Sequence, residues 1–477
     1  MSIHHLRCDQ LVALPRAEVF EFFARPENLA RITPPEMAFR MLGADGPMKV
    51  GLRLRYALRP LLGIPARWVS RITAFEAPVA FVDVQEKGPY RRWEHTHTFA
   101  DESVNGRVGT RVTDSITYEL PFGPLGDLVN ALVVRRRLEG IFAHRRSAVT
   151  RLLPAVERRD DPLRVAVAGG SGFVGGAIAA ELHRRGETAV VLSHRPGRAR
   201  AGLPDGVEVR AADIADPAAL ARALAGVDAL VISLAFPNSP MESPRRGHTF
   251  LLVDAVGTER LAQAAVSAGV RRIVYISGAG AAPDAERSWF RAKWRAEEAV
   301  RRSGIAYTII RPTWVYGPRD VALNRFLGFA KILPFVPLTG AGNQLLAPVF
   351  VDDVARLAAD ALRAENARNE TFEIGGPETL TMREVIRVAL RVSGRRRPLL
   401  PAPAVLLKLA AWPLQMLPAP PLTPSAVDFV NQPATVDTSR LLERMPRRLT
   451  PLDEGLATYI GPRTRPEPLP AGPEVKR

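Results

Sequence analysis

Apolar and polar positions along the chain follow two different periods, one before residue 155 and one after residue 163. In the first part, apolar residues alternate with polar ones along short stretches, as in strands with one buried face. These stretches are residues 53–58, 66–75, 80–86, 93–99 and 109–120. Apolar residues at helical spacing flank them, over residues 15–23 and 128–153. The pattern predicts an α+β domain in which a curved antiparallel sheet closes over a long C-terminal helix.

From residue 163 onwards, short apolar strands alternate with helical segments. The predicted strands are residues 165–168, 190–192, 207–210, 229–233, 272–277 and 307–311. Segments with helical spacing separate them, for example residues 217–225, 254–268 and 291–303. This alternation predicts an α/β domain with a doubly wound parallel sheet. Loops, prolines and short helices after residue 317 predict a small substrate-side region at the C-terminal end.

A charged segment with two prolines, residues 154–163, separates the two patterns. We therefore expect one domain over residues 1–155 and a second over residues 163–461. The Pro-rich and charged residues 462–477 predict a disordered tail. Residues 398–422 are apolar but interrupted by Lys408 and several prolines, which does not fit a transmembrane span. They predict a buried or partner-facing helix, with peripheral contact with a membrane surface as the alternative.

Composition limits the classes of partner. The net charge of +16 is spread over both parts without a basic tail, so we do not expect nucleic-acid binding. The single cysteine, Cys8, excludes a disulfide within the chain and a cysteine metal cluster. The first ten residues lack the pattern of a signal peptide. Together these features predict a cytoplasmic protein.

A glycine-rich turn joins the first strand of the second part to a helical segment. Gly169, Gly172 and Gly175 are spaced three residues apart and follow the apolar run that ends at Ala168. Glycines let the chain turn tightly and bring backbone N–H groups against a pyrophosphate, and the helix N-terminus adds partial positive charge. Strand, loop and helix together predict a Rossmann dinucleotide site. We expect the cofactor to contact Gly169, Ser171, Gly172, Phe173, Val174 and Gly175.

The end of the second strand of this domain favours NADP over NAD. Folds that prefer NAD usually place Asp or Glu there, because a carboxylate binds the ribose 2′-hydroxyl. Ser193, His194 and Arg195 stand at that place instead, and Arg195 offers donors and positive charge to a 2′-phosphate unless it is a solvated loop residue. Asp213 ends the third strand, where its carboxylate can meet the amino group of adenine.

The first part of the chain resembles the SRPBCC superfamily, the START-like helix-grip domains. The matching segments are residues 14–20, 26–29, 32–35, 81–90, 93–99 and 118–126. The resemblance covers nearly all of residues 3–153. It implies an apolar cavity between the sheet and the long helix, and a hydrophobic small molecule as ligand.

Residues 164–376 resemble the atypical and extended short-chain dehydrogenase/reductases, which include NAD(P)-dependent epimerases and dehydratases. The likeness is strongest to the branch that contains the NADPH-binding accessory subunit of respiratory complex I and its bacterial relatives. The matching motifs are residues 169–175, Asp213, and residues 257–261, 269–277, 290–297, 310–318, 348–355 and 372–377.

The chain departs from this family at its catalytic dyad. Members of the family usually carry Tyr-x-x-x-Lys, in which the lysine lowers the pKa of the tyrosine so that the phenol can pass a proton to the substrate. Lys293 occupies the lysine position, but Trp289 stands where the tyrosine is expected. Ser277 ends a strand at the place of the family's catalytic Ser or Thr. Lys293 and Ser277 are the catalytic candidates, and Lys293 could bind the cofactor ribose, act as the acid/base or be a surface lysine.

Two histidines in the first part are separated by one residue. His95 and His97 therefore share one face of their strand. A metal site needs a third ligand that the sequence does not place, although Glu94 and Asp83 are nearby. We expect polar groups at a cavity wall or sheet surface here, and no metal.

The two resemblances lead to two hypotheses on function. The first is an NADP(H)-dependent oxidoreductase or epimerase-like enzyme that acts on an apolar carbonyl compound such as a lipid, quinone or isoprenoid, held by the fused ligand-binding module. The second is a non-catalytic NADP(H)-binding sensor or accessory protein of a membrane-linked redox or lipid system. The absent tyrosine favours the second hypothesis, while Lys293 and Ser277 favour the first.

Overall fold

The computed structural model describes residues 2–460 except 62–63, 105–106, 122, 158, 237–241, 415–423, 425–426 and 429–430. The predicted tail, residues 462–477, lies outside these residues. Two seven-stranded sheets organise the chain, one antiparallel and one parallel. The domain boundaries placed at residues 155 and 163 remain predictions.

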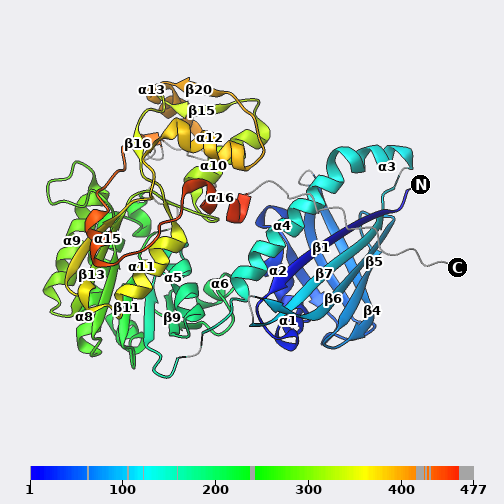
Figure 1. Cartoon of the computed structure of the whole chain (residues 1–477), viewed down its shortest axis with the longest axis horizontal. Coiled ribbons are helices and arrows are strands. Elements are labelled where there is room, and N and C mark those ends of the chain that lie inside the picture. The colour runs from blue at the N-terminus through cyan, green and yellow to red at the C-terminus, as the bar shows by residue number, and fades with distance from the viewer. Residues whose placement is uncertain are drawn as a thin grey trace. The chain divides into compact units, whose positions relative to one another are not determined.

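The antiparallel sheet has the strand order β1-β7-β6-β5-β4-β3-β2. Its strands are β1 (His4–Val12), β2 (Arg40–Ala44), β3 (Arg53–Leu61), β4 (Ile64–Glu76), β5 (Ala80–Lys87), β6 (Arg92–Val104) and β7 (Arg107–Glu119). The helices of this part are α1 (Arg16–Phe23), α2 (Leu29–Ile32), α3 (Pro124–Val129) and α4 (Arg135–Leu152). Figure 1 shows α4 lying along the curved sheet. Its apolar face, with Leu138, Phe142 and Val149, shares one core with the inner face of the sheet.

All five strands predicted in this part are present as β3–β7. β1 and β2 were not predicted: β2 has no fully buried residue, and Val12 is the only fully buried residue of β1, so neither strand has a strong apolar face. The resulting layers are those expected from the sequence, a curved antiparallel sheet with a long helix against it.

The parallel sheet has the strand order β10-β9-β8-β11-β12-β13-β18, in which the chain first runs to one edge and then returns past β8 to the other. Its strands are β8 (Arg164–Ala168), β9 (Thr188–Ser193), β10 (Glu208–Ala211), β11 (Ala229–Ile232), β12 (Arg272–Ile276), β13 (Ala306–Pro312) and β18 (Glu370–Ile374). This order confirms the predicted Rossmann-like α/β fold, whose switch point lies between β8 and β11.

Helices connect the parallel strands. They are α5 (Phe173–Arg184), α6 (Pro196–Arg200), α7 (Pro217–Ala223), α8 (Gly257–Ser267), α9 (Ser288–Arg302) and α11 (Val351–Ala361). A π-helical segment, η5 (Phe250–Val256), leads into α8, so the helix predicted from residue 254 is wider in its first turns. Figure 1 shows α8, α9 and α11 beside the sheet.

A smaller region follows β13, as the sequence predicts. It contains β14 (Val315–Tyr316), α10 (Val321–Ile332), β15 (Val336–Thr339), β16 (Leu345–Leu346), β17 (Val349–Phe350), β19 (Leu380–Thr381), α12 (Met382–Val392), β20 (Leu399–Ala402), α13 (Ala404–Leu414), α15 (Ser439–Arg444) and α16 (Leu452–Ile460). α13 leaves Val405, Leu406, Leu409 and Trp412 exposed, which disagrees with a buried helix. Among the residues that the structure describes, no helix has both the length and the apolar character of a membrane span.

Candidate functional site

The glycine turn after β8 has a geometry that only glycine allows at its first position. β8 is buried from Val165 to Ala168, and it ends at Gly169, whose φ is +80°. A Cβ atom on Gly169 would lie 2.0 Å from the backbone oxygen of Ser233, at the end of β11. The backbone N–H of Gly172 then donates to the Gly169 oxygen over 2.8 Å, which closes the turn.

The same turn fixes how α5 begins. A Cβ atom on Gly175 would lie 2.4 Å from the Gly169 oxygen, so the first turn of the helix packs against the loop without a side chain between them. The N–H groups of Phe173, Val174 and Gly175 form this first turn, where a helix supplies no carbonyl partner. They provide donors at the positive end of the helix dipole, and this arrangement fits a pyrophosphate.

Arg319 holds the outer side of the loop and was not predicted. Its guanidinium donates to the backbone oxygens of Ser171 and Gly172 over 3.0 and 3.1 Å. Because Arg319 is 147 residues from Gly172 in the sequence, no local pattern could have revealed this support.

The predicted ribose and adenine residues lie at the ends of β9 and β10. The Arg195 side chain is exposed, and its backbone N–H donates to Ser193 Oγ over 3.1 Å. Asp213 is also exposed, and its Oδ1 accepts the N–H of Ala215 over 2.8 Å, which orders the loop after β10. The Arg195 guanidinium is thus presented on the surface beyond the carboxyl end of β9, the strand that follows β8 in the sheet order.

Lys293 is not a solvated surface lysine. Its Nζ lies 2.7 Å from Asp254 Oδ1 and 3.4 Å from the Ile276 backbone oxygen, and 5.5 Å from the centre of the Tyr275 ring. The Lys293 side chain is 17 % exposed and that of Asp254 only 3 %. Burial favours the neutral amine, but the carboxylate of Asp254 and the Tyr275 phenol outweigh it, so the pKa of Lys293 lies above its usual range.

Ser277, the second catalytic candidate, is bound to a buried carboxylate. Its Oγ donates to Glu297 Oε1 over 2.6 Å, and Glu297 is completely buried. Arg311 donates to both oxygens of Glu297 over 2.8 and 2.7 Å. Sequence reasoning missed Glu297 because its partners come from β12 and β13, 20 and 14 residues away. Ser277 and Lys293 therefore both stand at the carboxyl end of β12, each in its own buried polar network.

Trp289 stands at the sequence position of the expected tyrosine, and its ring contacts aromatic side chains and the Arg287 guanidinium, 5.7 Å from the ring centre. Its ring centre lies 5.9 Å from that of Phe250 and 5.7 Å from that of Phe290. It packs on a small cluster formed by Phe236, Phe250, Ala255 and Ala292. No hydroxyl is present at this position to act with Lys293.

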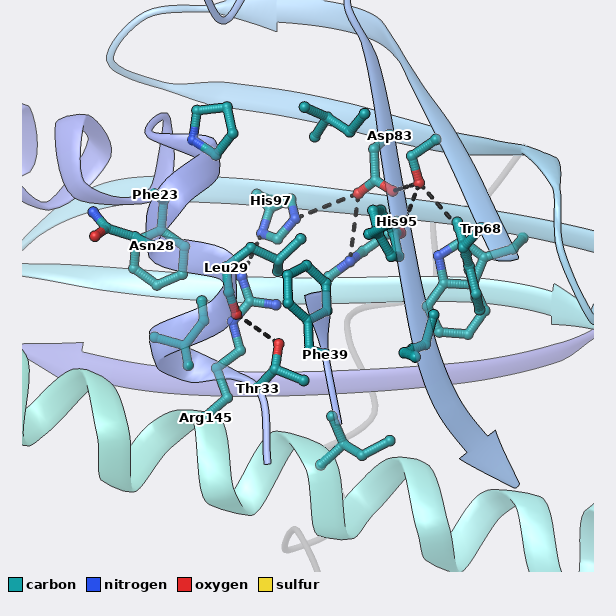
Figure 2. A pocket seen from close by; sticks show the side chains of 18 of the residues that line it. Phe23, Asn28, Leu29, Thr33, Phe39, Trp68, Asp83, His95, His97 and Arg145 are labelled. Carbon is teal, nitrogen blue, oxygen red and sulfur yellow. Dashed lines mark hydrogen bonds and ion pairs between the residues drawn. The ribbon is translucent and has the colours of Figure 1, made fainter. Parts of the chain in front are cut away.

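A cavity of about 170 Å³ lies between the antiparallel sheet and α4. Figure 2 shows side chains that line it. Most of the lining is apolar or aromatic and includes Phe22, Leu54, Trp68, Phe81, Trp93 and Leu138. The polar residues of the lining include Ser70, Asp83, His95, His97 and Arg145. An apolar cavity with a few convergent polar groups is the usual form of a small-molecule site.

Three of these polar side chains, His95, His97 and Arg145, gather around the carboxylate of Asp114. Asp114 Oδ1 lies 3.0 Å from His95 Nε2 and 2.8 Å from His97 Nδ1, and Arg145 Nη1 lies 3.6 Å from the same oxygen. Burial and the neighbouring His97 lower the pKa of His95 to about 4. Burial opposes ionisation of Asp114, but Arg145 and the two imidazoles keep the pKa of its carboxyl well below its usual value.

Comparison with known proteins identifies a family and relatives that match the second half of the chain. A family described as NAD(P)H-binding matches residues 169–327. The (4-alkanoyl-5-oxo-2,5-dihydrofuran-3-yl)methyl phosphate reductase of Streptomyces griseus is 33% identical over 48% of this chain and 74% of its own length. The 40 kDa subunit of the NADH-ubiquinone oxidoreductase of Neurospora crassa is 32% identical over 36% of this chain, which spans 47% of that subunit.

Among solved structures, the triphenylmethane reductase of Citrobacter sp. in complex with NADP(H) is similar, with a TM-score of 0.50 and 25% sequence identity. The match covers 61% of this chain and 98% of the reductase. The glycine turn, the order of the parallel strands and these relatives all indicate an NAD(P)H-binding site in the parallel-sheet part of the chain.

Proposed function

The chain belongs to the NAD(P)H-binding family of Rossmann-like reductases and epimerases, and from this membership we propose that it is an NADP(H)-dependent oxidoreductase. The turn at Gly169–Gly172–Gly175 is the observation that carries the proposal, since a Cβ atom on Gly169 or Gly175 would clash with a backbone oxygen. It presents the N-terminus of α5 to the pyrophosphate. When bound, NADPH supplies a hydride, and the chain positions the acceptor.

The choice of NADP over NAD rests on the end of β9. Ser193, His194 and Arg195 carry no acid there, and the exposed guanidinium of Arg195 can form charge-assisted hydrogen bonds with a 2′-phosphate. The similar triphenylmethane reductase of Citrobacter sp. binds NADP(H), which supports the same choice here.

We assign Lys293 to the ribose of the nicotinamide rather than to proton transfer. Asp254 keeps the amine charged, so it can donate hydrogen bonds but releases a proton less readily than a free lysine. The ion pair also holds the ammonium at the carboxyl end of β12. Ser277 would then act through Glu297 as a positioning residue of this strand end, because its proton is already donated to that carboxylate.

For the substrate, we propose an apolar carbonyl compound such as a quinone, lipid or isoprenoid. The support is the apolar cavity lined by Phe22, Trp68 and Trp93 in the antiparallel part, whose segments resemble the START-like ligand-binding domains. In this proposal residues 1–155 hold a hydrophobic small molecule, and residues 163–461 hold the cofactor.

A second candidate function is a non-catalytic NADP(H)-binding accessory protein. One specific observation favours it: Trp289, which carries no hydroxyl, stands in place of the proton-donating tyrosine and packs against an aromatic cluster. In that case NADP(H) would serve as a structural or sensed ligand. The likeness to a subunit of an NADH-ubiquinone oxidoreductase is compatible with this role.

One experiment separates the two functions. NADPH is titrated into the purified chain, and absorbance at 340 nm is then followed with a panel of quinones and apolar ketones. The enzyme proposal expects oxidation with at least one member of the panel, and a large loss of turnover in Lys293→Ala but not in Lys331→Ala, which removes an exposed lysine of α10. Tight binding of NADPH with no oxidation of any compound, and no effect of Lys293→Ala, would instead overturn the enzyme proposal.

A further inference from the structure

The cavity of the antiparallel part contains three side chains whose arrangement the cofactor proposal does not use. His95 and His97 alternate along β6, so both point to the inner face. On the neighbouring β5, Asp83 lies directly opposite His95. On the other neighbour, β7, Asp114 lies directly opposite His97. The register of three adjacent strands thus brings two imidazoles and two carboxylates together on one buried surface.

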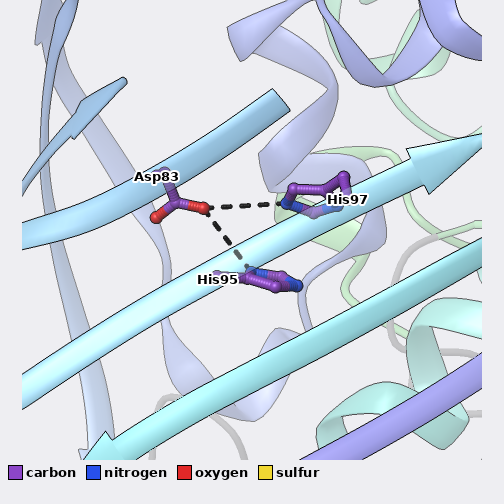
Figure 3. Close-up of side chains that lie close together, drawn as sticks. All are labelled: Asp83, His95 and His97. Atoms are coloured by element: carbon purple, nitrogen blue, oxygen red, sulfur yellow. Dashed lines mark ion pairs between the residues drawn. The ribbon is translucent and has the colours of Figure 1, made fainter. Parts of the chain in front are cut away.

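Asp83 Oδ2 faces one nitrogen of each histidine, as Figure 3 shows. It lies 3.6 Å from His95 Nδ1 and 3.6 Å from His97 Nε2. Both separations are too long for a good hydrogen bond. With bonds of about 2.1 Å, two ligand atoms on a tetrahedral zinc ion lie about 3.4 Å apart, so the observed spacing suits an ion between them better than a proton. One ligand atom from each of the three residues lies within 4.8 Å of the other two.

Asp114 determines which imidazole nitrogens are available. Its Oδ1 is within hydrogen-bonding distance of His95 Nε2 and His97 Nδ1, and a carboxylate accepts hydrogen bonds. His95 Nε2 hydrogen-bonds to this oxygen, and His97 Nδ1 also lies 3.5 Å from Arg145 Nη2. Because these two nitrogens have partners on one side, His95 Nδ1 and His97 Nε2 are the nitrogens that face Asp83 and can serve as ligands.

The remaining oxygen of Asp83 is held in place from behind. Ser70 Oγ donates to Asp83 Oδ1 over 3.1 Å. Ser70 in turn lies 3.0 Å from the Tyr56 hydroxyl and accepts the Trp68 indole N–H over 3.1 Å. Phe81 stacks on His97 with ring centres 4.2 Å apart. Such supporting contacts orient the ligands of metal sites and are characteristic of them.

We propose that Asp83, His95 and His97 bind a divalent transition-metal ion, through Oδ2, Nδ1 and Nε2, in the cavity of the antiparallel part. Two imidazoles and one carboxylate suit zinc or ferrous iron and leave coordination positions open. This assignment departs from the expectation of no metal. The sequence named Asp83 and Glu94 only as residues near the two histidines and did not choose between them. It does not depend on the NADP(H) proposal.

The open positions give the ion a role in the cavity. All three ligand residues line the cavity together with apolar side chains such as Leu54 and Trp93. A carbonyl or hydroxyl oxygen of an otherwise apolar molecule could complete the coordination, which would orient that molecule and polarise the bound group. The site therefore selects an oxygen-bearing hydrophobic ligand rather than a pure hydrocarbon.

The test uses the full chain. Chelator-treated protein is loaded separately with Zn²⁺, Co²⁺ and, without oxygen, Fe²⁺, and the metal content is measured after removal of excess ion. We expect about one tightly held ion per chain. X-ray absorption of the zinc form is expected to show two imidazole ligands, and cobalt to develop visible absorption. A chain that retains none of these ions, or a zinc spectrum without imidazole ligands, overturns the proposal whatever the variants do.

Variants assign the ligands. Asp83→Asn and His97→Gln keep side-chain size and are expected to weaken metal binding by more than about 100-fold, and Asp114→Asn, which changes a positioning residue, by about 10- to 100-fold. His5→Gln removes an exposed histidine of β1 and is the matched control, with unchanged affinity. Circular dichroism checks that each variant folds. Folded Asp83→Asn and His97→Gln chains that bind metal as tightly as the His5→Gln chain would contradict the assignment.

Discussion

Asp254 Oδ1 and Lys293 Nζ form an ion pair of 2.7 Å between a π-helical segment and α9, and both side chains are largely shielded from water. The two residues lie in different elements, Asp254 in η5 and Lys293 in α9. The pair links the two helices that follow β11 and β12, and it fixes the one lysine that the sequence singled out for cofactor chemistry.

Asp254→Asn is expected to lower the free energy of unfolding by about 3 kcal/mol, because it leaves the Lys293 ammonium buried without its counter-charge. The double variant Asp254→Asn/Lys293→Met is expected to recover part of this loss, since no unpaired charge remains. Urea unfolding followed by tryptophan fluorescence measures both variants and the single variant Lys293→Met, which completes the cycle. Additive effects of the two substitutions would show that the pair is not coupled.

Glu297→Gln is expected to cost about 3 kcal/mol of stability, since Glu297 is completely buried and compensates Arg311. The neighbouring Glu298→Gln is the matched control. Glu298 pairs with Arg301 at 2.7 Å but is partly exposed, so its loss should cost less than about 1 kcal/mol. Thermal unfolding compares the two variants, and equal effects would contradict the buried role of Glu297.

Gly169→Ala is expected to destabilise the chain by about 2 kcal/mol or more and to abolish measurable NADPH binding. The added methyl group would combine a φ of +80° with an approach of 2.0 Å to the Ser233 oxygen. Gly328→Ala is the control: it lies in α10, where a Cβ meets nothing within 4 Å, so alanine should be neutral or slightly stabilising. Cofactor fluorescence and denaturant unfolding give the two readouts.

The fold was largely predictable because its signals are local. β8, β9, β11, β12 and β13 each contain an apolar run, and the glycine spacing after Ala168 lies within seven residues. β18 was missed as a strand because only Phe372 and Ile374 are buried in it, so its apolar run is short. In the two large sheets, the strands that were missed, β1, β2 and β18, all lie at sheet edges, where less of the strand is buried.

The polar partners of the site were not predictable because they depend on register and packing. Asp254 and Glu297 each sit inside helical patterns that explain them equally well as solvated charges. Asp114 joins His95 and His97 only because β6 and β7 pair in one register, and a shift of one residue would turn its side chain outward. The sequence therefore identified candidate residues, while the structure supplied the counter-charges that determine their chemistry.

Arg195→Ala is expected to weaken NADPH binding by about 10- to 100-fold, which corresponds to the loss of about 1.5–3 kcal/mol for hydrogen bonds to a charged group. NADH binding should change little, because NADH lacks the 2′-phosphate that the guanidinium contacts. Arg198→Ala, an exposed arginine in α6, is the matched control for a general loss of positive charge. Titration of both cofactors into each variant measures the ratio of their dissociation constants. If Arg198→Ala lowers NADPH affinity as much as Arg195→Ala does, the attraction is diffuse and the assignment of the 2′-phosphate to Arg195 is wrong.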